Sequence, residues 1–182
     1  MELADLSDPK GDYLHPNNVE IVTPEFAAQI PGWEEGQVLV SLLGMNGLAL
    51  VDLDKRAVVD FIHGVWHEQH DPDLLANGNI LLFDNQGDLA AGMHSQILEI
   101  DPRNNEIVWR FPATDAEPFY SKALGNQQRL GNGNVLITES LHGRIFEVTP
   151  SGDVVWEYLN PAERAGFHEF LVGGQRLPRG DA

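Results

Sequence analysis

The amino-acid sequence predicts an all-β protein made of β-propeller blades. Two observations support this prediction. A unit of roughly fifty residues occurs three times along the chain, and each copy contains four short segments rich in β-branched, apolar and aromatic residues. Four short strands repeated at this period are the pattern of a propeller blade, whereas a β-sandwich has no reason to repeat its sequence.

The repeat is clearest when residues 79–111 are set beside residues 134–158. Each stretch starts with an apolar strand after an asparagine, continues with a strand that ends at a proline turn, and finishes with a strand that contains tryptophan. Trp109 and Trp156 occupy the same slot, and Asp60 fills it in the earliest copy. Because an indole ring fills the wedge between neighbouring sheets, we expect both tryptophans to be buried.

The connections between these segments have the composition of tight turns. Asp101-Pro-Arg-Asn-Asn and Thr149-Pro-Ser-Gly-Asp combine proline, which presets the turn dihedral, with residues that accept a positive φ. A further strand is predicted at the start of each unit, over residues 18–22, 73–75 and 127–130. In a propeller this first strand lines the central channel.

The chain divides into a short tail, residues 1–12, and one repeat domain, residues 13–182. The domain contains three full four-stranded units and a stray strand, at about 13–63, 64–112, 119–160 and 170–178. The stray strand is predicted because Gln175-Arg-Leu repeats Gln128-Arg-Leu of the third unit. Closed propellers have four or more blades. We therefore expect a partial propeller, or one completed by another chain, for example in a homodimer.

The acidic composition narrows the range of partners. A net charge of −17 repels nucleic acid and anionic lipid, so neither is expected as a partner. No apolar run is long enough to cross a bilayer, which predicts no membrane insertion. The first residues lack the basic start and apolar stretch of a secretory signal, and the compartment stays open. The absence of cysteine excludes disulfides, thiolate metal ligands and cysteine nucleophiles.

Three segments of the sequence are distinctive. They are His70-Asp-Pro-Asp-Leu-Leu-Ala-Asn-Gly-Asn-Ile-Leu-Leu-Phe-Asp-Asn, Gln128-Arg-Leu-Gly-Asn-Gly-Asn-Val-Leu-Ile-Thr-Glu-Ser and Tyr13-Leu-His-Pro-Asn-Asn-Val. All three resemble segments of the bacterial aryl sulfotransferase family. The resemblance extends from about Tyr13 to Pro161 and implies a C-terminal portion of a six-bladed propeller.

The resemblance also implies a chemistry. Members of this family move a sulfuryl group from an aryl sulfate to a phenol without a nucleotide sulfate donor, and no cofactor is implied. A channel histidine becomes transiently sulfated, assisted by further histidines and an arginine. The implied partners are a phenolic sulfate donor and a phenol acceptor, and most members are periplasmic or secreted.

Two of the seven histidines lie at similar positions in their units. His15 stands four residues before Val19, and His70 stands four residues before Leu74, both at the start of a first strand. This spacing predicts that His15 and His70 face one channel. Imidazole suits sulfuryl transfer because it is neutral, nucleophilic and a good leaving group near neutral pH. Asp71 can orient the ring beside it, so His70 is the predicted nucleophile.

The three sulfuryl oxygens also require a positive donor, and planar arginine suits them best. Arg129, on the first strand of the third unit, is the predicted donor. Two positions depart from the family pattern. Gly125 stands where the third unit would carry a histidine, and the stretch after Phe83-Asp-Asn lacks the family's arginine. The alternative prediction is therefore a non-catalytic propeller module that binds a partner through its faces.

Two further patterns resemble cation sites. His63, His67 and His70 have the spacing of metal ligands, but this segment is predicted to be a loop between blades and matches no standard zinc motif. Asp84-Asn-Gln-Gly-Asp resembles a calcium loop, yet it lacks the downstream glutamate of an EF-hand, and a hairpin turn is the simpler interpretation. The sequence thus predicts no metal site.

Overall fold

The computed structural model describes residues 12–177 apart from 88–93, 113, 115–116 and 165. Almost all of the predicted tail, residues 1–12, and the last residue of the predicted stray strand lie outside this part. The described residues contain three four-stranded antiparallel sheets, each formed by four strands consecutive in the chain. This result confirms the predicted all-β fold. We call the sheets the first, second and third blade.

The first blade contains β1 Pro16–Ile21, β2 Val38–Leu42, β3 Gly47–Asp52 and β4 Ala57–His63. A single helical turn, α1 Pro24–Ala27, follows β1 because Thr23 caps it: the Thr23 hydroxyl accepts the N–H of Phe26 at 3.3 Å. A 3-10 turn, η2 Leu43–Met45, connects β2 to β3. None of the helices in the described residues is long and apolar enough to cross a membrane.

The second blade contains β5 His70–Leu74, β6 Ile80–Asp84, β7 Gln96–Asp101 and β8 Glu106–Pro112. The third blade contains β9 Asn126–Arg129, β10 Val135–Glu139, β11 Arg144–Val148 and β12 Val154–Leu159, with a 3-10 turn, η3 Ser140–His142, between β10 and β11. A short hairpin of β13 Glu163–Arg164 and β14 Phe167–His168 follows.

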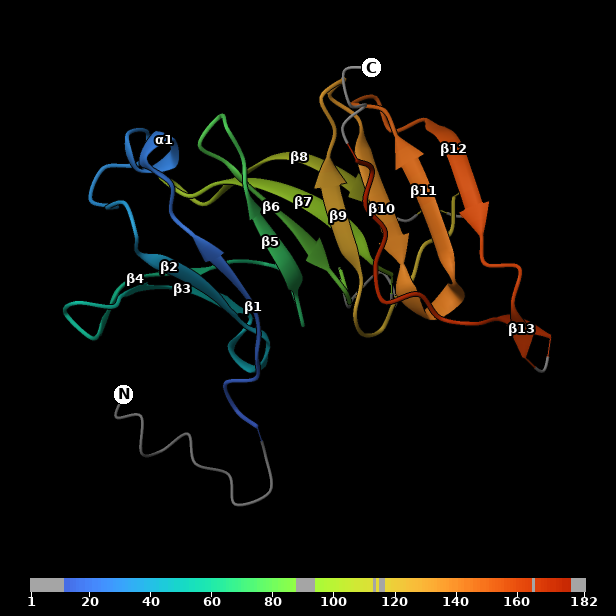
Figure 1. Ribbon diagram of the computed structural model, residues 1–182, viewed down its shortest axis with the longest axis horizontal. Helices are drawn as coiled ribbons and strands as arrows, with labels where there is room; N and C mark the ends of the chain where they lie inside the picture. The colour runs from blue at the N-terminus through green and yellow to red at the C-terminus, as the bar shows by residue number, and fades with distance from the viewer. Residues whose placement is uncertain (1–11, 88–93, 113, 115–116, 165, 178–182) are drawn as a thin grey trace.

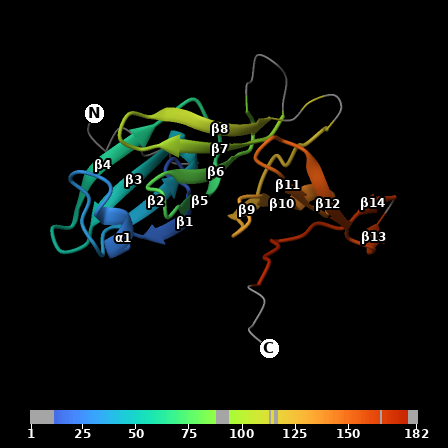
Figure 2. The ribbon, with the colours of Figure 1, turned by 90° about the horizontal axis from the view of Figure 1, so that it is seen from above.

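The blades succeed one another in chain order, from blue through green to orange in Figure 1 and again from above in Figure 2. β1 lies beside β5, and β5 lies beside β9, although these pairs share no backbone ladder. The first strands of consecutive blades are therefore neighbours, as the propeller prediction requires.

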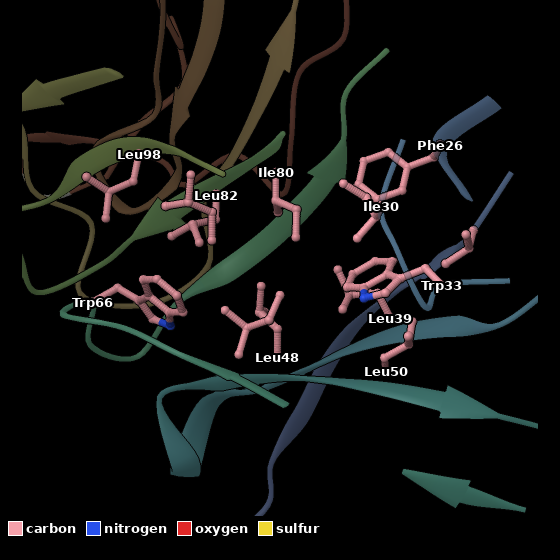
Figure 3. Close-up of a cluster of buried hydrophobic side chains, with 13 residues drawn as sticks. Phe26, Ile30, Trp33, Leu39, Leu48, Leu50, Trp66, Ile80, Leu82 and Leu98 are labelled. Atoms are coloured by element: carbon pink, nitrogen blue, oxygen red, sulfur yellow. The ribbon is translucent and has the colours of Figure 1, made fainter. Parts of the chain in front are cut away.

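Strand β6 explains why the sequence is continuously apolar in the middle of the second blade. Ile80 and Leu82 point to a cluster shared with the first blade, and Leu81 and Phe83 point to a cluster shared with the third blade. A strand covered on both faces needs no polar alternation. Figure 3 shows the cluster between the first and second blades, where Leu48 and Trp66 lie among these side chains.

The tryptophans are buried differently from the prediction. Trp66 is only 1 % exposed and Trp33 is also buried, whereas Trp109 is half-buried and Trp156 is 44 % exposed. The expectation that Trp156 is buried was wrong because its face of the third blade has no further sheet packed on it among the described residues. Asp60, in the same slot of the first blade, accepts the indole N–H of Trp33 at 3.0 Å.

The predicted stray strand runs beside β9, but its described residues do not form a β-strand (Figure 1). The backbone N–H of Arg176 donates to Gln128 Oε1 at 2.8 Å, and its carbonyl accepts from Gln128 Nε2 at 3.2 Å. The N–H of Gly174 donates to the Thr138 hydroxyl at 2.9 Å. The segment is therefore hydrogen-bonded to side chains of β9 and β10.

Candidate functional site

Strand pairing defines which residues are equivalent along the first strands. In each blade the fourth residue of the second strand pairs with a polar residue of the first strand, which is Asn18, His70 or Asn126. The structural counterparts of His70 are therefore two asparagines. The expected shared register of His15 and His70 was wrong because Val19 and Leu74 are not equivalent: Val19 pairs with the third residue of β2, whereas Leu74 pairs with the first residue of β6.

His15 lies in the turn before β1. Its φ is 43°, its ring Nδ1 lies 3.1 Å from a carboxylate oxygen of Asp12, and its side chain is 47 % exposed. The carbonyl of His15 accepts the N–H of Leu43 at 3.1 Å. No hydrogen bond joins His15 to His70, so these contacts show His15 as an exposed residue that shapes a turn.

His70 opens β5 and is half-buried. Its Nδ1 lies 2.8 Å from Asn85 Oδ1 and 3.2 Å from the carbonyl oxygen of Glu68. Its Nε2 has no hydrogen-bond partner among the described residues. The imidazole is thus held by Nδ1, while Nε2 makes no hydrogen bond to the described residues.

Gly125 stands where a third histidine was expected, and the structure explains the glycine. Its φ is 100°, and a Cβ at this position would lie 2.6 Å from the ring of Phe83. Both the backbone conformation and the close approach of the ring require glycine. The third blade therefore cannot carry a histidine at this position.

Three carboxyl groups gather on the first strands beside His70. Asp71 accepts an amide N–H of Asn18 at 2.9 Å and the backbone N–H of Gln127 at 3.2 Å, so it joins all three blades. Burial raises the pKa of Asp71. Burial, with the charges of Asp71 and Glu20 beside it, raises the pKa of Asp73 to about 8, and burial with Asp71 raises the pKa of Glu20.

We expect the Asp73 carboxyl to make stability depend on pH. The folded state keeps the proton up to about pH 8, while the unfolded chain loses it near the ordinary value of 3.8. The unfolded state therefore binds fewer protons between these values, and the free energy of unfolding falls as the pH rises through this window. Asp73→Asn removes this effect, so its gain in Tm over the wild type should be larger at pH 8 than at pH 5, by about 5 °C.

Thermal unfolding of both proteins at pH 5 and pH 8 measures this difference. Asp54→Asn removes the same formal charge from an exposed turn and is the matched control. An equal change of Tm at both pH values for Asp73→Asn would show that the carboxyl does not titrate in this window.

Arg129 lies away from His70. It forms an ion pair with Glu99, donates to the carbonyl of Gly133 at 3.0 Å, and places its guanidinium 5.3 Å from the ring centre of Trp109. Arg129 pairs with the first residue of β10, whereas His70 pairs with the fourth residue of β6. The predicted sulfuryl-binding arginine is thus engaged in the contact between the second and third blades.

The same contact is repeated one blade later. Arg176 forms an ion pair with Glu147, and its guanidinium lies 5.5 Å from the ring centre of Trp156. Glu147 also accepts the side-chain amides of Asn132 and Asn134, as Glu99 accepts those of the other Asn-Gly-Asn turn. The repeated Asn-Gly-Asn and Gln-Arg-Leu sequences were the signal that could have identified this structural role.

The alternative cation sites also have structural explanations. His63 ends β4, the fourth strand of its blade, and His67 Nδ1 lies 3.3 Å from the carbonyl of Gly87. Asp84 accepts the backbone N–H groups of His67 and Gly87 and the amide of Gln96. Within the described ranges, no three His, Cys, Asp or Glu side chains form a group that could hold a metal ion.

Two cavities lie near these elements. A cavity of about 370 Å³ follows the first strands and is lined by Asp71, Asp73, Asn126, Gln127, Gln128 and Gly174, among others. A larger one, of about 800 Å³, lies at the η3 turn and is lined by His94, Tyr120, His142, Arg144, Phe167 and His168, among others. His70 lines neither of these two cavities, although its neighbour Asp71 lines the smaller one.

Comparison with known proteins identifies the family. The arylsulfotransferase (ASST) family model matches residues 4–161. The chain belongs to the arylsulfotransferase family. A search of curated proteins finds no match to it.

Solved structures similar to this arylsulfotransferase-family chain are β-propellers at low identity. They include the Dos1 propeller (11 % identity, TM-score 0.56, 84 % of this chain and 36 % of that one) and the WD40 propeller domain of Doa1 (12 %, 0.54, 80 % and 40 %). A virginiamycin B lyase from Staphylococcus aureus with quinupristin is also similar (14 % identity, TM-score 0.53, 90 % of this chain and 47 % of that one). These likenesses show the propeller fold, and the chain spans less than half the length of each.

Proposed function

We propose that this chain carries the nucleophile of an aryl sulfotransferase and that the nucleophilic atom is Nε2 of His70. One observation supports this best. In a chain of the arylsulfotransferase family, His70 lies on a first strand with Nδ1 held by a buried amide and with Nε2 unbonded among the described residues. A histidine that needs only one nitrogen for structure has the other available for chemistry.

The proposed reaction has two steps at one sulfur atom. Nε2 attacks the sulfur of an aryl sulfate, an N–S bond forms, and the S–O bond to the first ring breaks as that phenol leaves as phenolate. The acceptor phenol oxygen then attacks the same sulfur, the N–S bond breaks, and the acceptor proton passes to a general base. The imidazole returns to its starting state.

The remaining groups of the reaction are proposed to come from the sheets that complete the ring. Arg129 is engaged with Glu99, and His15 is engaged with Asp12, so neither is positioned at His70. A second copy of the chain would contribute three further blades. The raised pKa of Asp73 keeps its carboxyl uncharged near neutral pH, which limits the repulsion of an anionic sulfate donor.

The experiment is sulfuryl transfer from a coloured aryl sulfate to a second phenol, with the oligomeric state measured in the same buffer. We expect release of the coloured phenol and, without the acceptor, a mass increase of one SO₃ group on the peptide that contains His70. Labelling of another histidine would overturn the assignment of the nucleophile.

A non-catalytic binding module is the second candidate function. The observation in its favour is that both of the other predicted catalytic side chains, those of His15 and Arg129, are occupied by structural contacts. Absence of both phenol release and SO₃ labelling in every assembled form would support this candidate and refute the transferase proposal.

A further inference from the structure

The side chain of Asn85 is fixed between the second and third blades. It follows β6 directly and is 0 % exposed. Its amide nitrogen donates to two backbone carbonyls of the loop before β9, that of Ser121 at 2.8 Å and that of Leu124 at 2.7 Å. Leu124 has a φ of 61°, which is uncommon for such a residue and places this loop under local constraint.

These two bonds decide which way the Asn85 amide faces. An amide nitrogen has two hydrogens, and both are used by the carbonyls of Ser121 and Leu124. The reversed orientation would place Oδ1 against two carbonyl oxygens, and both buried carbonyls would lose their hydrogen-bond donor. The atom that faces His70 is therefore Oδ1, which can only accept a hydrogen bond.

The acceptor at Asn85 in turn decides where the imidazole proton lies. His70 Nδ1 is 2.8 Å from Asn85 Oδ1 and 3.2 Å from the carbonyl oxygen of Glu68, and both of these oxygens are acceptors. A neutral imidazole carries one proton, and two acceptors at Nδ1 hold it there. The lone pair of the neutral ring then lies on Nε2.

We propose that Asn85 is a positioning residue that holds neutral His70 in the Nδ1–H tautomer and so keeps the lone pair on Nε2. The use of that lone pair for sulfuryl transfer rests on the proposed function, whereas the tautomer does not. The loop before β9 supplies the two carbonyls. The packing of the third blade on the second blade therefore determines which ring nitrogen of His70 carries the proton.

The test is nuclear magnetic resonance of protein labelled with nitrogen-15 in histidine, because the two ring nitrogens of a neutral imidazole give distinct shifts for each tautomer. The wild type with the imidazole of His70 in its neutral form should show a protonated Nδ1 and an unprotonated Nε2. In Asn85→Leu, which keeps a similar volume but has no acceptor, the population should shift toward the Nε2–H form.

Ser95→Ala is the matched control. The Ser95 hydroxyl donates to the backbone carbonyl of Asn85 at 2.8 Å and accepts the N–H of Ser121 at 2.9 Å, so its loss perturbs the same buried cluster without touching the Asn85 side chain. We expect the tautomer of His70 to be unchanged in this variant. A shift as large as that of Asn85→Leu would indicate a general packing effect and overturn the assignment to Asn85.

An Nε2–H tautomer in the wild type would overturn the proposal by itself, even if Asn85→Leu failed to fold. In a protein active as a sulfotransferase, Asn85→Leu should also lower kcat by about 10-fold or more with little change in KM. An inactive wild type with the Nδ1–H tautomer would refute the sulfotransferase proposal and leave the role of Asn85 standing.

Discussion

Replacing His70 with glutamine is expected to lower the rate of sulfuryl transfer by about 1,000-fold or more. Glutamine is polar and similar in reach, but it has no nitrogen lone pair that can form a bond to sulfur. The loss should therefore appear in kcat, and the labelled peptide should no longer gain an SO₃ group. The measurement is the initial rate of phenol release, together with the intact mass after incubation with the aryl sulfate.

Two other histidines provide controls for His70→Gln. His142, whose side chain is 57 % exposed and paired with Glu139, lines the larger cavity. We expect His142→Gln to keep the wild-type rate within about 3-fold. The His142 side chain is exposed, and an ion pair with an exposed member contributes little to stability. His15→Gln tests the register of the first strands, and a rate near that of the wild type agrees with its position in the turn. Full activity of His70→Gln would show that another group is the nucleophile.

Replacing Trp66 with alanine is expected to reduce the free energy of unfolding by about 3–5 kcal/mol. Trp66 is buried in the cluster between the first and second blades, next to Leu48 and Leu82 (Figure 3). Its removal opens a cavity that the neighbouring strands cannot close without losing their pairing. Urea unfolding followed by circular dichroism measures the loss.

Phenylalanine at the same position separates packing from hydrogen bonding. The indole N–H of Trp66 is buried and has no hydrogen-bond partner in the part of the chain that the structure describes, so Trp66→Phe should cost about 1.5 kcal/mol or less. Trp156→Ala is the control at an exposed site and should cost about 1 kcal/mol or less. A loss for Trp156→Ala as large as that for Trp66→Ala would show that Trp156 is covered in the assembled protein.

The sequence by itself determined the strands and their grouping into blades. Strand character is a local property, because alternation, β-branched content and proline or glycine turns act over a few residues. The repeat then placed equivalent strands in equivalent sheets, so segments such as Ile80–Asp84 and Val135–Glu139 were predicted at their observed positions. The family resemblance, carried by the segment from His70 to Asn85, was also readable without a structure.

Only the tertiary structure decided which side chains meet. Val19 and Leu74 pair with different positions of β2 and β6, which spacing in the sequence does not reveal, and His15 therefore lies outside the register of His70. The contact of Arg129 with Glu99 joins strands of different blades, and Asn85 finds its partners in a loop more than thirty residues away. Such contacts depend on how the sheets pack, because a local pattern fixes the strand but not its neighbours.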